Sequence, residues 1–177
     1  MSTLDTALLR RAFADVTERA ACAAVRGGRA AGQVEVILAG KYVAAQDAEV
    51  LAAAGVEVIG ENRLQDLVAK HAILGDRVTF DFIGHLQRRK AKDVVDLVRM
   101  IHSLDSVELA REIDLRSRRP VRVLCQVNIA GEESKGGILP PQIDSFVEAV
   151  SAYPNIELCG LMTLPPAASD PNDSRPH

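Results

Sequence analysis

Short runs of apolar, often β-branched residues alternate along the chain with longer segments whose apolar residues recur at helical spacing. Runs of the first kind predict strands, and segments of the second kind predict amphipathic helices. The predicted strands are 34–39, 56–59, 78–83, 100–103, 121–128 and 157–163. The predicted helices are 4–26, 47–54, 63–74, 86–98, 105–119 and 140–153.

Glycine, proline and capping residues predict where these helices begin and end. Glycines follow three of the helical segments, at Gly27, Gly55 and Gly75, and glycine is the preferred residue just past a helix end. Asp47 is a candidate N-cap, and Asp105 with Glu108 predicts a capping box. Pro140 and Pro141 stand where a helix would begin.

Regular alternation of strands and helices predicts an α/β fold with a parallel sheet covered by helices. Such a sheet is either doubly wound and open or closed into a barrel. Polar groups stand at or just past the end of each predicted strand, at Lys41, Asn62, His85, Ser103, Asn128 and Thr163. A barrel places functional groups at the carboxyl ends of successive strands, whereas an open sheet concentrates its site at one switch point. The pattern therefore favours a TIM-type (β/α) barrel with an N-terminal helix.

The length of the chain bounds this barrel. A complete barrel has eight βα units and about 250 residues, whereas this chain has 177 residues and six predicted strands. We therefore expect residues 1–177 to form a single barrel domain that is incomplete, with about six of eight units, and that lacks the last one or two strands.

The composition of the chain argues against some classes of binding partner. Hydrophobic residues make up 47% of the chain, the net charge is −3 and aromatic residues are 3%, so we expect neither nucleic acid nor a membrane as partner. The sequence has no apolar run long enough for a transmembrane helix and no secretory signal pattern. Three widely spaced cysteines indicate a reduced, cytoplasmic protein, with Cys125 and Cys159 in its core. The histidines lack metal-ligand spacing, so no metal is predicted.

Each polar strand end has a structural and a functional interpretation. Lys41 is either a solvated lysine or a Schiff-base lysine, and the second role requires a desolvated or cation-rich pocket that lowers its pKa. Asn62 is either a turn and capping residue or a ligand contact, and His85 is either a loop histidine or a ligand contact. Ser103 either faces the barrel mouth or begins a turn. The glycine-rich loop 131–137 lacks the order of a phosphate-binding loop and is interpreted as a flexible loop or lid.

Taken together, the strand ends resemble the pyridoxal phosphate homeostasis protein family. The motifs are Gly40-Lys41, Gly60-Glu61-Asn62-Arg63 with Gln65, Phe82-Ile83-Gly84-His85-Leu86-Gln87, Ile101-His102-Ser103-Leu104-Asp105, Gln126-Val127-Asn128 and Gly160-Leu161-Met162-Thr163. They occur in the order that the family shows, from residue 34 onward. The family usually has Ser or Thr where this chain has Gly40, but this chain keeps the family's lysine at the next position, Lys41.

The resemblance implies a barrel like the alanine racemase N-terminal domain, with pyridoxal 5'-phosphate (PLP) held as a Schiff base by Lys41. It places Asn62, His85, Ser103 and Met162 near the cofactor. It also implies a role in vitamin B6 homeostasis without catalytic turnover, with PLP-dependent apoenzymes as candidate partners and a monomeric state.

Two alternatives remain open. One is a fold-type III PLP enzyme resembling alanine racemase, although the second acid/base that racemisation needs comes from a further domain and subunit in racemases. The other is a truncated product that cannot retain PLP. Family members continue past residue 177 into segments that supply a phosphate cup and an arginine near the pyridine nitrogen, so we expect weak retention without them.

Overall fold

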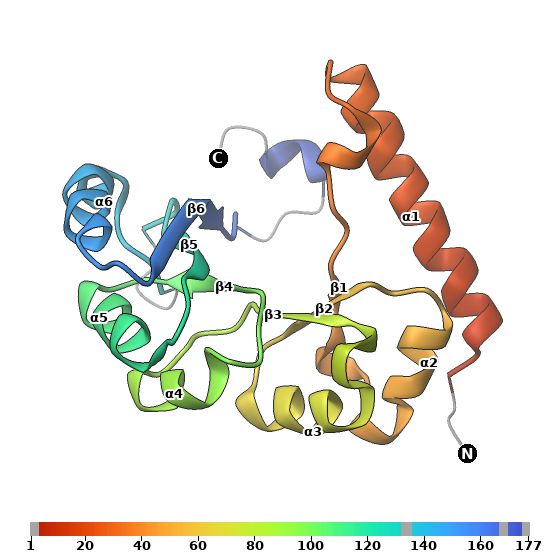
Figure 1. The fold of residues 1–177 in the computed structure, drawn as a ribbon. Helices are drawn as coiled ribbons and strands as arrows, with labels where there is room; N and C mark the ends of the chain where they lie inside the picture. Colours follow the sequence, from red (N-terminus) through yellow and green to blue (C-terminus); the bar gives the residue numbers. More distant parts are fainter. Residues whose placement is uncertain (1–3, 132–135, 167–169, 175–177) are drawn as a thin grey trace. The chain divides into compact units, whose positions relative to one another are not determined.

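The computed structural model describes residues 4–131, 136–166 and 170–174, and Figure 1 shows its strands and helices alternating along the chain. The strands are β1 Leu38–Ala39, β2 Val58–Glu61, β3 Thr79–Phe82, β4 Met100–Leu104, β5 Val121–Val127 and β6 Ile156–Thr163. The helices are α1 Thr6–Arg26, α2 Ala48–Ala53, α3 Leu64–Leu74, α4 Ala91–Val94, α5 Val107–Arg116 and α6 Ile143–Ser151. The strand order in the sheet is β1-β2-β3-β4-β5-β6, and β1–β2, β4–β5 and β5–β6 are parallel pairs.

The chain comprises two compact units, residues 1–81 and residues 82–177. In the first unit, α1 begins at Asp5, whose carboxylate accepts the backbone N–H groups of Ala7 and Leu8, and it ends at Gly27. The end of this helix agrees with the sequence prediction, and its start at Thr6 lies two residues after the predicted one. The guanidinium of Arg10 donates to the carbonyl of Ala53 and so ties α1 to the last turn of α2.

The core of the first unit lies between its short strands and the helices α2 and α3. Its largest fully buried apolar residues are Leu51, Ile59, Leu67, Leu74 and Phe80. Burying a side chain of this size contributes about 1.5–3 kcal/mol relative to leaving it exposed, so these five residues are the main hydrophobic stabilisation of the unit.

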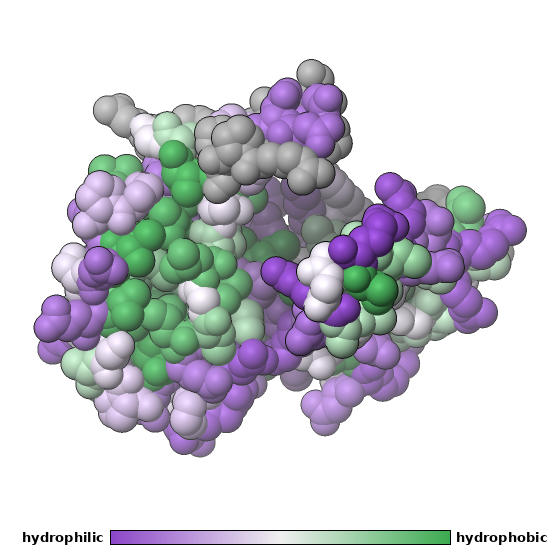
Figure 2. All heavy atoms as spheres, turned by 90° about the horizontal axis from the view of Figure 1, so that it is seen from above, coloured by the Kyte–Doolittle hydropathy of each residue, from purple (hydrophilic) through white to green (hydrophobic). Residues whose placement is uncertain are grey.

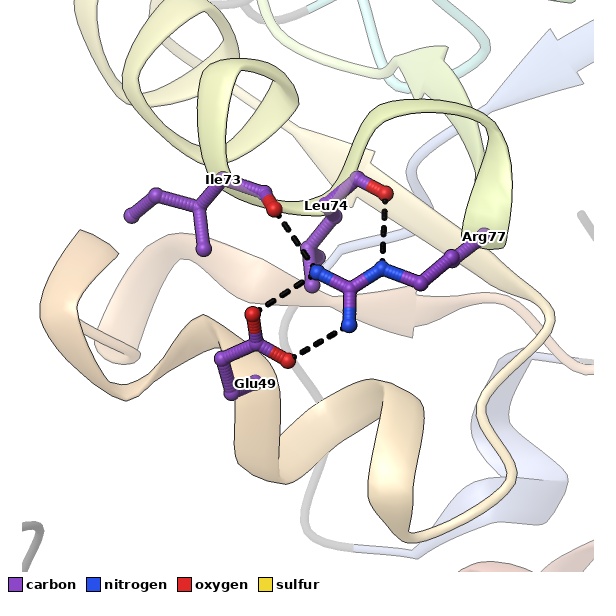
Figure 3. Close-up of polar contacts among 4 residues, drawn as sticks. All are labelled: Glu49, Ile73, Leu74 and Arg77. Atoms are coloured by element: carbon purple, nitrogen blue, oxygen red, sulfur yellow. Dashed lines mark hydrogen bonds and ion pairs between the residues drawn. The ribbon is translucent and has the colours of Figure 1, made fainter.

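The carboxyl end of α3 is fixed by Arg77, as Figure 3 shows. Its guanidinium donates to the carbonyls of Ile73 and Leu74, which have no partner within the helix. Two further bonds of 2.7 Å reach both carboxylate oxygens of Glu49 on α2. The same side chain therefore caps one helix and joins it to another. The helix ends at Gly75, whose φ of 52° favours glycine.

In the second unit, β5 is paired on both sides, with β4 and with β6. Cys125 on β5 is buried, as predicted, and burial raises the pKa of its thiol to about 11. Cys159 on β6 is exposed, so the prediction of a core thiol there is wrong. Exposed and half-buried residues alternate along β6, and Cys159 lies on the exposed side. Hydrophobic residues also reach the surface of this unit, as Figure 2 shows, and they include Leu139, Leu161 and Leu164.

Several element boundaries differ from the prediction. The first strand contains only Leu38–Ala39, and residues 34–37 are not part of it. The segment predicted as helix 86–98 contains a 3₁₀ turn, Arg88–Lys90, followed by the four residues of α4. Helix α5 ends at Arg116, before Pro120. Pro140 begins a 3₁₀ turn that leads into α6, as the proline rule predicts.

The predictions of N-capping residues are less accurate than the predictions of helix-ending glycines. Asp47 does stand at the N-cap of α2, but its side chain makes no capping hydrogen bond. The N-cap of α5 is Ser106, again without a side-chain cap, so the capping box of Asp105 and Glu108 is wrong. The carboxylate of Asp105 contacts His85 instead. A tertiary contact has therefore replaced the local one.

Within the described part of the chain, no helix combines the length and the apolar character needed to cross a membrane. In the predicted glycine-rich loop 131–137, residues 132–135 lie outside the described residues.

Candidate functional site

Lys41 and Asn62 stand at the same edge of the sheet in the first unit. In the parallel register of β1 and β2, Ala39 is opposite Gly60. Lys41 lies two residues past Ala39, and Asn62 lies two residues past Gly60. The two strands therefore present these side chains at equivalent positions beyond their carboxyl ends, where parallel α/β proteins place functional groups.

Lys41 belongs to the 3₁₀ turn Gly40–Tyr42, which the Val43 N–H closes by donating to the Gly40 carbonyl over 2.9 Å. Its side chain is exposed, and its Nζ atom lies 4.8 Å from the centroid of the Tyr42 ring, within the range of a cation–π contact. The closed, desolvated pocket expected for a Schiff-base lysine is therefore not provided by the first unit, which gives Lys41 an aromatic neighbour instead.

A buried ion pair lies directly behind these strand ends. The ammonium of Lys70 on α3 donates to Glu61 Oε1 over 2.5 Å and to the Gly40 carbonyl over 2.9 Å. Lys70 is 1% exposed and Glu61 is 0% exposed. Lys70 thus contacts the residue before Lys41 and the residue before Asn62. The Gly40 carbonyl at the end of β1 and the Glu61 carboxylate at the end of β2 both bind the Lys70 ammonium.

Burial dominates the electrostatics of Glu61. Desolvation raises the pKa of this carboxyl, and the hydrogen bond and charge of Lys70 oppose that rise. Its Oε2 atom is buried and has no hydrogen-bond partner among the residues that the structure describes. Lys70 therefore satisfies Oε1, and the backbone of Asn62 adds a smaller effect that also lowers the pKa of this carboxyl.

Sequence reasoning missed Lys70. The signal that could have found it is its position on the apolar stripe of α3, three residues after Leu67 and four before Leu74, both of which are buried. A lysine on the buried face of a helix requires a partner. The sequence does not say which of the neighbouring acids supplies it.

In the second unit, His85 and Asp105 form a contact, with 3.2 Å between His85 Nδ1 and Asp105 Oδ2. The His85 side chain is 66% exposed and that of Asp105 is 15% exposed. The hydroxyl of Ser106 donates to the other carboxylate oxygen of Asp105. This arrangement fixes one ring nitrogen of His85 and leaves the other available to a ligand.

Ser103 and Met162 lie on β4 and β6, with β5 between them. Ser103 is fully buried, and its Oγ atom has no hydrogen-bond partner in the described part of the chain. Met162 is half-buried and stands opposite Gln126 in the sheet register. The structure thus places Lys41 and Asn62 together in one unit, and His85, Ser103 and Met162 in the other.

Two relationships to known proteins follow. Residues 37–176 match the family model of the alanine racemase N-terminal domain. A pyridoxal phosphate homeostasis protein of Aquifex aeolicus is 37% identical over 92% of this chain and 73% of its own length. The chain belongs to the pyridoxal phosphate homeostasis protein family. The resemblance inferred from its motifs is therefore confirmed, as is the α/β fold of the alanine racemase N-terminal domain.

Solved structures agree with this placement in the pyridoxal phosphate homeostasis family. The crystal structure of an unknown protein from Bifidobacterium adolescentis has a TM-score of 0.87 and 31% identity, and the match covers 99% of this chain and 78% of that one. PipY of Synechococcus elongatus, solved with PLP bound, has a TM-score of 0.68 and 28% identity, over 86% of this chain and 72% of PipY.

Two features of the chain itself fit a polar cofactor. The side-chain oxygens Asn62 Oδ1 and Ser103 Oγ are both buried, and neither has a hydrogen-bond partner among the described residues. Leaving such an atom unsatisfied costs about 1–3 kcal/mol. Each of these oxygens is able to accept a hydrogen bond from a polar ligand. Both residues are also among those that the family resemblance places near PLP.

Proposed function

We propose that this chain binds PLP through a Schiff base to Lys41 and acts in the intracellular homeostasis of PLP. Asn62, His85, Ser103 and Met162 are proposed to contact the cofactor. The observation that carries the proposal is the position of Lys41 in a fixed turn at the carboxyl end of β1, beside Asn62, in a chain of the pyridoxal phosphate homeostasis family.

Three further observations support the proposal. A relative with the same fold, PipY, has been solved with PLP bound. The unsatisfied oxygens of Asn62 and Ser103 require hydrogen-bonding partners. A free amine that follows a strand end is chemically competent to condense with an aldehyde once it is deprotonated.

We propose that the chain holds the cofactor without catalytic turnover, as a cytoplasmic monomer that can deliver PLP to apoenzymes. The homeostasis name of its relatives supports the carrier role. The cysteines of the described residues are free thiols, which suits a reducing compartment.

The test is absorbance spectroscopy of the purified chain after addition of PLP, followed by borohydride reduction and mass mapping of the modified lysine. The expected result is a yellow adduct trapped on Lys41 and absent from the Lys41→Ala protein. Lys92→Ala is the matched control, because Lys92 is an exposed lysine on α4, and its adduct should equal that of the wild type.

Labelling spread evenly over exposed lysines, or undiminished in Lys41→Ala, would overturn the proposal. An assay for alanine racemisation with the PLP-loaded chain tests the carrier role separately. Turnover that depends on Lys41 would favour an enzyme over a carrier.

A further inference from the structure

The buried lysine of the first unit connects the two strand ends that carry the proposed PLP ligands. An ammonium group has three N–H donors, and two of those of Lys70 bind the Gly40 carbonyl and Glu61 Oε1. Gly40 is followed directly by Lys41, and Glu61 directly by Asn62. The spacing between the two strand ends is therefore set in part by one side chain from α3.

The Gly40 carbonyl has two roles in this arrangement. It accepts the Val43 N–H, which closes the turn that carries Lys41, and it accepts the Lys70 ammonium. A carbonyl oxygen has two lone pairs, so both bonds can form at once. Moving this carbonyl would therefore reorient the turn and the side chain of Lys41 with it.

Glu61 also explains why position 40 is glycine here. A Cβ atom on residue 40 would lie 2.2 Å from Glu61 Oε1 and 2.9 Å from the Ile59 Cγ2 atom. The carboxylate that binds Lys70 thus occupies the space that a side chain at position 40 would need. Gly40, Glu61 and Lys70 form one interlocking group.

From these contacts we propose that Lys70 is a positioning residue for Lys41, acting through the Gly40 carbonyl and Glu61. The inference rests on the proposed PLP-binding function and deepens it. Burial of an ion pair is a weak source of stability compared with apolar residues of the same volume. A role in fixing the turn at Lys41 accounts for keeping this pair in the core.

The test compares two double variants that each remove one ion pair without leaving a lone charge. Glu61→Gln/Lys70→Met removes the buried pair, and Glu49→Gln/Arg77→Met removes an exposed pair of the same unit. Each protein is treated with PLP and borohydride, and the fraction of adduct on Lys41 relative to the other lysines is measured by mass mapping. Circular dichroism and thermal melting establish that each variant is folded.

Removing the buried pair should lower the Lys41 fraction by about 10-fold, because the Gly40 carbonyl loses its hydrogen bond from a charged group. Removing the exposed pair should leave it unchanged. An unchanged Lys41 fraction in a folded Glu61→Gln/Lys70→Met protein would overturn the inference while leaving the proposed function intact. A wild-type chain that forms no adduct on Lys41 would overturn the proposed function itself.

If the double variant does not fold, a substitution at Gly40 tests the same contacts among Gly40, Glu61 and Lys70. Gly40→Ala places its new methyl group against Glu61 Oε1 and Ile59 Cγ2, so it displaces the strand end and should also lower the Lys41 fraction. An unchanged Lys41 fraction in a folded Gly40→Ala protein would count against the coupling.

Discussion

Two acid–base pairs of the first unit, Glu49–Arg77 and Glu61–Lys70, have similar geometry but different surroundings. Glu49 and Arg77 meet at 2.7 Å on the surface, with side chains 56% and 53% exposed. Glu61 and Lys70 meet at 2.5 Å in the core, where both are almost fully buried. The exposed pair joins two helices and caps one of them (Figure 3), whereas the buried pair reaches the strand end beside Lys41.

The pKa values of the two carboxyls shift in opposite directions because one is buried and the other is exposed. The hydrogen bond from Arg77 lowers the pKa of Glu49, because water already solvates both groups and little desolvation opposes the attraction. Desolvation raises the pKa of Glu61 in spite of an equally close cation. The distance between the two charges does not by itself determine the pKa of the carboxyl, because the cost of removing each charge from water also contributes.

The largest effect is expected from Lys70→Met alone. This change leaves the Glu61 carboxylate buried without its cation, and breaking a buried pair in this way costs about 3–5 kcal/mol. Chemical denaturation should therefore show a strongly reduced free energy of unfolding. The double variant Glu61→Gln/Lys70→Met should recover much of that loss, and a single variant as stable as the wild type would show that the pair is not buried in solution.

A smaller effect, opposite in sign for the two carboxylates, is expected in the pH dependence of stability. A raised pKa means that folded Glu61 holds its proton more tightly than the unfolded chain does. Its contribution to stability is full below the ordinary value of 4.5 and is lost as the pH rises through the folded pKa. For Glu49, whose pKa is lowered, the contribution is present above 4.5 and is lost as the pH falls through the folded pKa.

Denaturation of Glu61→Gln and Glu49→Gln across this acid range measures both slopes. Relative to Glu61→Gln, the wild type should lose stability as the pH rises, and relative to Glu49→Gln it should gain stability. Slopes of the same sign in the two comparisons would contradict the difference in burial.

The smallest effect is expected from Arg77→Met. The exposed pair is screened by solvent and by salt, so most of the change should come from the lost cap on the Ile73 and Leu74 carbonyls. Thermal melting at low and high salt separates the two parts. A variant whose deficit disappears in high salt would show that the ion pair, and not the cap, is the main contribution.

Local sequence patterns predicted the elements and the identity of the strand ends well. Gly27 and Gly75 do end α1 and α3, and Lys41 and Asn62 do follow the first two strands. These features follow from apolar periodicity and from backbone preferences of single residues, which act over a few positions. The motifs at the strand ends also led to the family, which the comparison with known proteins confirmed.

Local sequence patterns do not predict the contacts that a residue makes with partners far away in the chain. Asp105 was predicted to cap a helix locally, but its carboxylate contacts His85, twenty residues earlier in the numbering. The first strand was predicted from six apolar-leaning residues, yet only Leu38–Ala39 form it. Strand pairing and side-chain partners depend on which segments meet in space, and a local pattern does not contain that information.

The sequence by itself determined the alternation of strands and helices, the helix-ending glycines and the motifs that identify the family. Only the tertiary structure decided that Lys70 is buried, that it binds Gly40 and Glu61, and that Gly40 has no room for a side chain. Periodicity predicts which face of a helix is apolar. The partner of a buried charge is decided by the packing of residues that lie 9 and 30 positions from it in the chain.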